Sequence, residues 1–319
     1  MIIKKSPEDF VVTEKTKLNL NPAGRYSYFL MEKKNITTLD AARQVSRHLN
    51  VPLRLVNYAG TKDKHAITKQ AISVYGCKER NDLVISENLK IYYIGQGNER
   101  LNLGDLEGNY FTITVRGLSQ NQLSALPEQA EMQIENYFDE QRFSSRNFEI
   151  GLAILKKDWK RVGEILGIKD NVSNNIRRLN KKILLFYLTS VQSFVFNELL
   201  AGYVRKNARK TYEVRYSLGR FVFSEEGMPD INLPMVGFGT EMSEDISCIL
   251  EKLDLSPRDF VLRSLPGMSQ EGYERKAFIN TKIKFSVNED YAVLDFFMPK
   301  GSYATIAVKK IFRSAPGSG

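Results

Sequence analysis

The sequence of 319 residues contains only two cysteines, two histidines and one tryptophan. Cys77 and Cys248 are far apart and form no CxxC pair, so neither a disulfide framework nor a zinc ribbon is indicated. The scarcity of histidine and cysteine also excludes a metal site built from clusters of these ligands. No run approaches the roughly 18 apolar residues that a membrane span needs. We therefore expect a soluble protein that makes no membrane contact and resides in the reducing cytoplasm.

Nucleotide-binding and hydrolase motifs are missing as well. There is no GxxxxGK[ST] loop to cradle phosphates, and no GxGxxG opens a helix after a strand. Neither His48 nor His65 is accompanied by a GxSxG elbow, which argues against a Ser-His-Asp triad. We therefore expect no nucleotide, metal or redox cofactor. Carboxylates, lysines and aromatic side chains remain as the groups that can support chemistry.

Positive charge is what the chain has in excess. It carries 46 Lys and Arg against 37 Asp and Glu, a formal net charge of +9, which favours polyanionic partners such as nucleic acid. Residues 146 to 182 hold ten basic and four acidic residues, interleaved with apolar positions at helical spacing. We interpret this segment as amphipathic helices with a basic outer face. On charge alone, that face either contacts RNA or is simply solvated.

The secondary-structure pattern predicts strands, then helices, then strands. Thr38 is expected to cap a helix in which Ala42, Val45 and Leu49 share one face. Residues 211 to 272 are mixed and loop-rich. This order favours an α+β core interrupted by an insertion. Runs of β-forming residues predict strands at residues 9 to 14, 26 to 31, 71 to 75, 90 to 94, 110 to 115 and 291 to 298.

Asp63 is the carboxylate with the most unusual local surroundings. It lies between Lys62 and Lys64 in a turn that begins at Gly60. Neighbouring cations favour the ionised carboxylate, which suits a nucleophile or a base better than a proton donor. An ordinary charged turn would have the same pattern. The local sequence leaves both interpretations open.

The segment GTKDKHAITKQ at residues 60 to 70 resembles the GxKDKxAxTxQ signature of the TruD family of tRNA pseudouridine synthases. Further family motifs follow in order: PEDFVV at residues 7 to 12, LGDLEGNYF at 103 to 111, NYFDEQRFS at 136 to 144, QSFVFN at 192 to 197 and MPKGSYAT at 298 to 305. The chain departs from the family pattern at Asp139, Ser144, Gln192, Tyr303 and the pair Lys309 and Lys310. The resemblance therefore covers essentially the whole chain.

The resemblance implies a fold and a division into domains. It implies an α+β pseudouridine synthase core with a mixed, largely antiparallel sheet and a central cleft, and an inserted TRUD-type α/β domain. The core is expected at residues 1–132 and 273–313, the insertion at 133–272 and a flexible tail at 314–319.

The resemblance also implies an isomerase that converts uridine to pseudouridine in tRNA, with uridine 13 as its target. Asp63 would then be the catalytic nucleophile and Lys4 its ion-pair partner. Whether the carboxylate attacks C1′ or abstracts the C2′ proton stays open. The alternative is a non-catalytic RNA-binding protein on a synthase scaffold.

The same resemblance supplies substrate-binding candidates. A flipped-out uridine needs stacking and hydrogen bonds to its edge, and the motifs offer Phe10, Phe111 and Tyr303 for packing and Asn109 for a uracil bond. Each aromatic residue could instead be an ordinary core side chain. Contacts to RNA are expected from Lys62, Lys64 and His65. The implied partner is tRNA, and we expect a monomer without cofactors.

Overall fold

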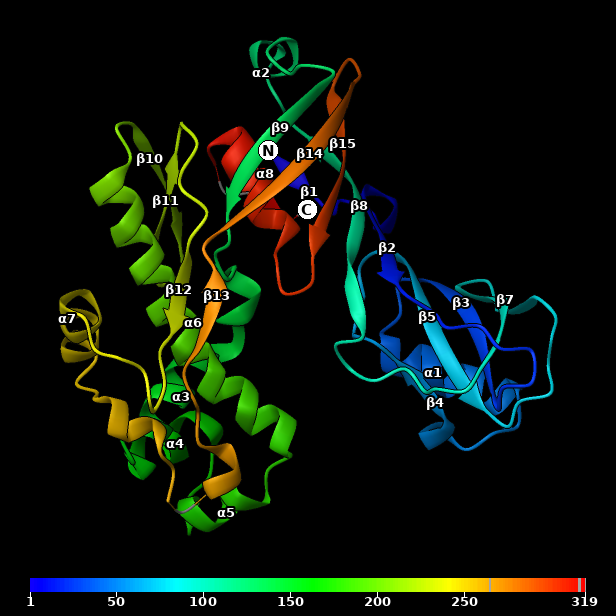
Figure 1. Cartoon of the computed structure of the whole chain (residues 1–319), viewed down its shortest axis with the longest axis horizontal. Helices are drawn as coiled ribbons and strands as arrows, with labels where there is room; N and C mark the ends of the chain where they lie inside the picture. The colour runs from blue at the N-terminus through cyan, green and yellow to red at the C-terminus, as the bar shows by residue number, and fades with distance from the viewer. Residues whose placement is uncertain (264, 315–316, 319) are drawn as a thin grey trace. The chain divides into compact units, whose positions relative to one another are not determined.

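The computed structural model describes residues 1–263, 265–314 and 317–318. Its chain forms two compact units, and Figure 1 labels most of their helices and strands. Of the described residues, unit 1 comprises 1–132, 280–304 and 317–318, and unit 2 comprises 133–263, 265–279 and 305–314. Each unit has its own buried apolar core.

Unit 1 is built on a twelve-stranded sheet, in which the order β6-β7-β3-β5-β2-β8-β15-β14-β9 forms the main path. β2 pairs parallel with β5, whereas β8 pairs antiparallel with both β2 and β15. The expected mixed, largely antiparallel sheet is therefore confirmed. The strands are β1 (Ile2–Ile3), β2 (Phe10–Thr16), β3 (Tyr26–Lys34), β4 (Val56–Tyr58), β5 (Ile67–Tyr75), β6 (Leu83–Ser86), β7 (Leu89–Gly97), β8 (Leu106–Arg116), β9 (Gln129–Glu135), β14 (Phe278–Val287), β15 (Tyr291–Pro299) and β16 (Gly317–Ser318).

The helix α1 (Thr38–His48) packs on the sheet of unit 1 (Figure 1). Ala42 and Val45 are fully buried against β3, β5 and β7, as the predicted apolar face requires. The N-cap is Thr37 and not Thr38, because the Thr37 side chain accepts a hydrogen bond from the backbone N–H of Asp40. A further short helix, α2 (Gln120–Ser124), completes this unit.

Unit 2 is organised around one long helix, α6 (Lys181–Asn207), which packs against α3 and α7 and against the strands β11 and β12. At one end of the unit, α3, α4 and α5 gather together (Figure 1). The remaining elements are α3 (Asn147–Leu155), α4 (Trp159–Leu166), α5 (Val172–Arg178), α7 (Glu244–Lys252), α8 (Ala304–Phe312), the hairpin β10 (Thr211–Tyr216) and β11 (Gly219–Ser224), and the ribbon β12 (Asn232–Met235) and β13 (Tyr273–Lys276). Short 3₁₀ helices occur at Pro7–Asp9, Leu53–Leu55, Glu140–Arg142, Ser144–Arg146, Pro257–Phe260 and Pro266–Met268.

The apolar character of α6 was not foreseen. By length and mean hydropathy this helix could cross a membrane, although the sequence pattern had indicated no such segment. Within unit 2, however, 61% of its most apolar window is buried. Val191, Val195 and Leu188 are completely inaccessible in the core. Packing inside the unit therefore accounts for most of the apolar window, while Ile183, Leu185 and Phe186 near the start of the helix are exposed.

The C-terminal boundary of the predicted core is wrong, since residues 305–313 belong to unit 2. Two buried ion pairs hold α8 there. Lys309 pairs with Asp139, and the Lys310 ammonium lies 2.9 Å from a carboxylate oxygen of Glu135. Residues 273–279 also belong to unit 2, because β13 pairs with β12.

Part of the predicted flexible tail is paired with the sheet. Gly317 and Ser318 form β16, which pairs parallel with β1, so these two residues are part of the sheet. Residues 315, 316 and 319 of the predicted tail lie outside the described residues.

Candidate active site

Asp63 lies in an irregular segment between β4 and β5 of unit 1. Side chains from α1 and β5 fix this segment. Thr38 Oγ accepts a hydrogen bond from the backbone N–H of Lys62 (2.9 Å), and Gln70 Nε2 donates to the carbonyl oxygen of Gly60 (2.9 Å). Both anchoring side chains are buried. The segment is therefore held at two points close to the aspartate, although it has no regular secondary structure.

Lys4 is the direct partner of Asp63. Its ammonium lies 2.5 Å from Asp63 Oδ2, and the two side chains are 24% and 28% exposed. The same ammonium stands 4.0 Å from the centroid of the Phe10 ring, and His65 Nε2 donates to the Lys4 carbonyl oxygen (3.0 Å). Lys4 has a φ of 59°, a left-handed conformation that costs a non-glycine residue about 1–2 kcal/mol. These contacts hold Lys4 in that conformation. The Asp63 carboxylate is paired with a cation and remains partly exposed to solvent.

Lys33 supports the same segment from inside the core. Its side chain is fully buried at the end of β3, and its ammonium donates to the carbonyl oxygens of Asp63 (2.7 Å) and Ile36 (2.8 Å). Burial lowers the pKa of Lys33 to about 8, while the negative charge of Asp63 opposes that shift. Among the described residues no carboxylate forms an ion pair with it. The sequence analysis missed Lys33, since a lysine at the end of a strand gives no local signal of burial.

The expected role of Lys62 as an RNA contact is contradicted by its position. Its ammonium lies 2.6 Å from Glu14 Oε2, and the two side chains are 7% and 0% exposed. It also donates to Asn109 Oδ1 (2.8 Å). Glu14 on β2 and Asn109 on β8 are directly opposite each other in the sheet, so one ammonium bridges both. Lys62 therefore links the Asp63 segment to Asn109 from inside the unit. Glu14, its ion-pair partner, was not predicted from the sequence.

Two of the aromatic candidates lie mostly inside unit 1. Phe10 is 4% and Phe111 9% exposed, and their rings meet edge to face at 6.0 Å. Phe111 also stacks on Phe296 at 5.7 Å. These contacts match the core role that the sequence left open. The Phe10 ring additionally provides an apolar floor beneath the Lys4 ammonium.

The sheet register brings two of the motifs side by side. Asn109 on β8 lies opposite Met298 on β15, in the motif that contains Tyr303. A side chain at Gly108 would place its Cβ 2.3 Å from the Met298 carbonyl oxygen, so this approach requires glycine. Gly301 has a φ of 81° in the turn between β15 and α8. Tyr303 follows that turn and is half-buried.

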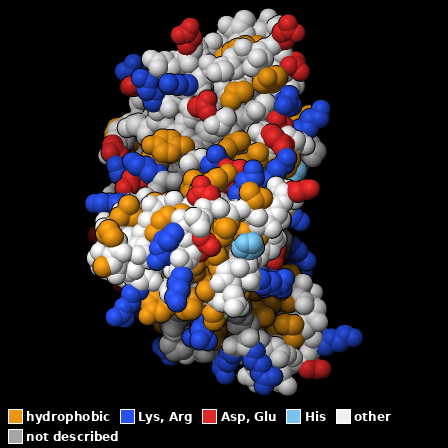
Figure 2. All heavy atoms as spheres, turned by 90° about the vertical axis from the view of Figure 1, so that its right-hand side faces the viewer, with side chains coloured by type: hydrophobic (Ala, Val, Ile, Leu, Met, Phe, Trp, Pro, Cys, Tyr) orange, Lys and Arg blue, Asp and Glu red, His pale blue; other side chains and the backbone are white. Residues whose placement is uncertain are grey.

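Lys64 and His65 are exposed beside the paired carboxylate. Lys64 forms no ion pair with any described residue, so its charge faces solvent. In Figure 2 the upper part of the face carries carboxylates together with Lys and Arg side chains, whereas Lys and Arg predominate in the lower part. Such a surface attracts a polyanion, and RNA contact by Lys64 and His65 stays a prediction.

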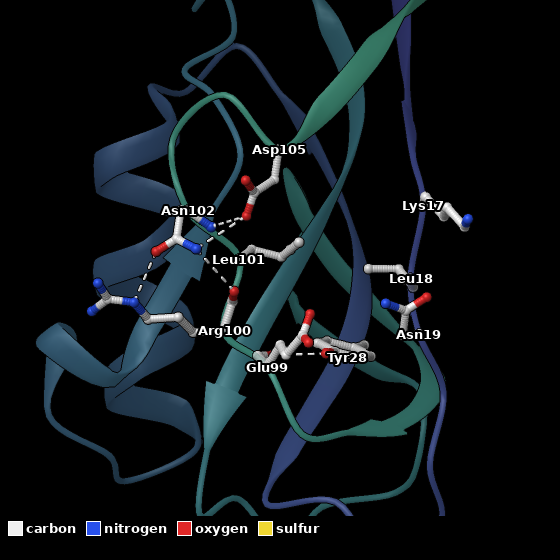
Figure 3. A pocket seen from close by; sticks show the side chains of 9 residues that line it. All are labelled: Lys17, Leu18, Asn19, Tyr28, Glu99, Arg100, Leu101, Asn102 and Asp105. Atoms are coloured by element: carbon white, nitrogen blue, oxygen red, sulfur yellow. Dashed lines mark hydrogen bonds between the residues drawn. The ribbon is translucent and has the colours of Figure 1, made fainter.

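A separate hollow of about 510 Å³ lies elsewhere in unit 1, with Lys17, Tyr28, Arg100 and Asp105 among its labelled lining residues (Figure 3). Asp63 does not line it. Figure 3 shows the carboxylate of Asp105 hydrogen-bonded to Asn102. The loop between these two residues contains Gly104, whose N–H donates to the carbonyl oxygen of Ala59 (2.7 Å), just before the segment that carries Asp63. The hollow is thus a neighbour of the candidate site and not part of it.

The site supplies carboxylates, ammonium groups, an amide and aromatic rings. In the described residues, no group of three or more His, Cys, Asp or Glu side chains could hold a metal ion. An ionised carboxylate that is paired yet reachable can stabilise or trap positive charge at a sugar C1′.

Comparisons with known proteins point to one family. The family model described as tRNA pseudouridine synthase D (TruD) matches residues 1–169 and 218–311. Similar curated proteins are the tRNA pseudouridine synthase D of Aquifex aeolicus (29% identical over 378 residues, 98% of both chains) and a probable tRNA pseudouridine synthase D of Nanoarchaeum equitans (27% identical over 383 residues, 98% of both). Among solved structures, a putative TruD from Methanosarcina mazei superposes with a TM-score of 0.71 at 23% identity, covering 99% of this chain and 94% of that one.

Proposed function

Because this chain belongs to the TruD family of tRNA pseudouridine synthases, isomerases that convert uridine to pseudouridine in tRNA, we propose that Asp63 is its catalytic carboxylate and uridine 13 its target. The observation that carries the assignment is the ion pair between Lys4 and Asp63. The pair keeps the carboxylate ionised and oriented, and the exposure of about a quarter leaves it open to substrate.

The reaction breaks the N1–C1′ bond of uridine, turns the uracil and joins C5 to C1′. The C5 proton is lost and N1 gains one, so no atom is added or removed. Positive charge develops at C1′ when the glycosidic bond breaks, and a carboxylate can stabilise that charge or trap the sugar covalently. Asp63 has one of two roles in this scheme: it attacks C1′, or it removes the C2′ proton.

Asn109 is proposed to recognise the uracil edge. Its Oδ1 accepts from the Lys62 ammonium, which fixes the orientation of the amide. No described residue accepts a hydrogen bond from its Nδ2. The NH₂ group is thus available to donate to a uracil carbonyl. The half-buried Tyr303 would pack against the base, whereas the buried Phe10 and Phe111 would support the site from inside unit 1. Lys64 and His65 would contact the phosphates of the tRNA.

Unit 1 would carry catalysis and unit 2 would be the TRUD-type insertion. The isomerisation needs no cofactor, because its bonds balance without a redox or group-transfer step. The two cysteines are free, which fits a reducing cytoplasm. We propose a monomer, which light scattering tests. The intact Lys4–Asp63 pair favours the enzyme over a non-catalytic RNA-binding protein.

The test is tritium release from tRNA that contains 5-tritiated uridine. Asp63→Asn should release none while its tRNA dissociation constant stays within about twofold of wild type, because only the reacting carboxylate is removed. Asp290→Asn is the matched control, since Asp290 is exposed in the same unit and has no ion pair among the described residues. Normal release by Asp63→Asn would refute the assignment.

A further inference from the structure

Unit 2 contains a small hollow at the start of α4. Its volume is about 220 Å³, and it is lined by Lys157, Trp159, Ser173, Leu262 and Arg263. Trp159 is the only tryptophan of the chain. It is half-buried and packs against the apolar core of the unit, to which the buried Leu262 belongs. The hollow is smaller than the roughly 300–1,000 Å³ of pockets for drug-sized ligands, so it suits a single flat ring.

Unpaired positive charge surrounds the hollow. Lys157 and Arg263 are exposed, and neither forms an ion pair within the described part of the chain. The neighbouring Lys156 differs, since its ammonium is paired with Asp254 at 3.4 Å. Asp158, which separates Lys157 from Trp159, is engaged as the N-cap of α4. The two cations at the hollow therefore keep their charge available to an outside anion.

The surrounding surface has the same character. Four further basic side chains on or beside α4 and α5 are exposed and form no ion pair with a described residue. These are Lys160, Lys169, Arg177 and Arg178. An aromatic ring set among unpaired cations is the arrangement by which proteins hold an unpaired base and its phosphates. This observation favours RNA contact over plain solvation for the basic face of residues 146 to 182.

Two larger hollows among the described residues do not share this chemistry. The hollow of about 500 Å³ beside α7 has Glu241 and Glu274 in its lining and no Lys or Arg. The hollow of unit 1 has the carboxylates of Glu99 and Asp105 beside its two cations. The carboxylates disfavour a polyanion at the hollow beside α7, and the hollow of unit 1 presents both signs of charge.

We propose that the hollow at Trp159 takes one unpaired base of the tRNA substrate. The base stacks on the indole, and Lys157 and Arg263 bind the flanking phosphates. The identity of the RNA rests on the proposed function. The contact itself rests on the ring, the cations and the size of the hollow. The site would add affinity and fix where the tRNA lies on unit 2, without taking part in the isomerisation.

The single tryptophan makes a direct measurement possible, because its fluorescence reports on this hollow alone. Titrating the full-length protein with unmodified tRNA transcript should quench the emission saturably, with the same dissociation constant that filter binding gives. Heparin, a polyanion without bases, should bind and leave the emission nearly unchanged. Absence of quenching by saturating tRNA, or equal quenching by heparin, would overturn the proposal.

Variants separate stacking from charge. Trp159→Leu should weaken tRNA binding about 5- to 150-fold, the worth of one stacked base, and Trp159→Phe should retain most of the affinity together with the packing. Lys157→Met and Arg263→Met should each reduce the slope of log K against log salt by about 1. Lys156→Met is the matched control, because its charge is already paired. Unchanged affinity in Trp159→Leu, or equal slopes for Lys156→Met and Lys157→Met, would contradict the site.

The proposed function and the Trp159 site are tested independently of each other. Tritium release from the substrate tRNA without any quenching would remove the Trp159 site and leave the catalytic assignment standing. Quenching by tRNA that is never isomerised would do the reverse.

Discussion

Replacing Lys62 by methionine should destabilise unit 1 far more than replacing Lys64, although both lysines flank Asp63. The Lys62 ammonium is paired with Glu14, and these side chains are 7% and 0% exposed. Methionine would leave the buried Glu14 carboxylate without a counter-charge, with only the hydrogen bond from the Thr16 hydroxyl, and loss of one partner of a buried ion pair typically costs about 3–5 kcal/mol. Lys64 is exposed and unpaired among the described residues, and such surface changes stay within about 0.5 kcal/mol.

Urea unfolding followed by far-ultraviolet circular dichroism measures this difference. Tryptophan fluorescence is unsuitable here, because Trp159 lies in unit 2 and reports on that unit. With a slope of about 2–3 kcal/mol per M, Lys62→Met should lower the midpoint for unit 1 by roughly 1–2 M. Lys64→Met should leave it almost unchanged.

A double-mutant cycle identifies the cause. Glu14→Gln alone should also destabilise unit 1, since it leaves the Lys62 ammonium buried and short of a counter-charge. Combining Glu14→Gln with Lys62→Met should cost at least about 1 kcal/mol less than the sum of the two single changes. Additive effects, or equal midpoints for Lys62→Met and Lys64→Met, would refute the buried bridge.

Three further predictions follow from other contacts. Lys4→Met should lower the single-turnover rate about 10- to 100-fold, an increase of about 1.4–2.8 kcal/mol in activation free energy, because Asp63 loses the ammonium at 2.5 Å. The tRNA affinity should not change. An unchanged rate would argue against a role for the pair. Burial lowers the pKa of Lys33 from its ordinary value of 10.5 to about 8 in the folded protein, so the unfolded chain holds more protons than the folded one between these pH values. Wild-type stability relative to Lys33→Met should therefore rise by up to about 3 kcal/mol from pH 8 to 10.5 in urea titrations, whereas a flat difference would contradict the burial. Lys309→Met should lower the free energy of unfolding by about 3–5 kcal/mol, measured by tryptophan fluorescence, because Asp139 would stay buried in unit 2 without a counter-charge. A loss below about 1 kcal/mol would show that this pair is dispensable.

Much of unit 1 was predictable because its strands carry the periodic signal. Each of the six predicted strands overlaps an observed one, from β2 to β15. The segment of residues 211 to 272 was harder. It contains β10, β11, β12 and α7, where the sequence showed only a mixed, loop-rich pattern. β12 has four residues and includes Pro234, so no alternation could reveal it, and its strand character comes from pairing with β13.

The candidate site was predictable where a motif marks it and not where only tertiary contacts do. The sequence led to Lys4 and Asp63, which the structure places in contact. It could not tell which lysine beside Asp63 turns inward, since Lys62 and Lys64 are equivalent in the local pattern. Lys33 was missed because its burial depends on packing between β3 and the Asp63 segment.

Two departures from the family motifs proved to be related. Asp139 and Lys309 are separated by 170 positions, yet they form a buried ion pair in unit 2. Sequence alone presented them as two unconnected substitutions. Their contact explains why helix α8 belongs to unit 2.

Mapping pseudouridine in an unmodified tRNA transcript tests the catalytic assignment most directly. After incubation with wild-type protein, carbodiimide treatment and primer extension should give a strong stop at uridine 13, and after Asp63→Asn that stop should be absent. A stop of equal strength with Asp63→Asn, or no stop anywhere in the tRNA with wild type, would contradict the role of Asp63 as the carboxylate that isomerises uridine.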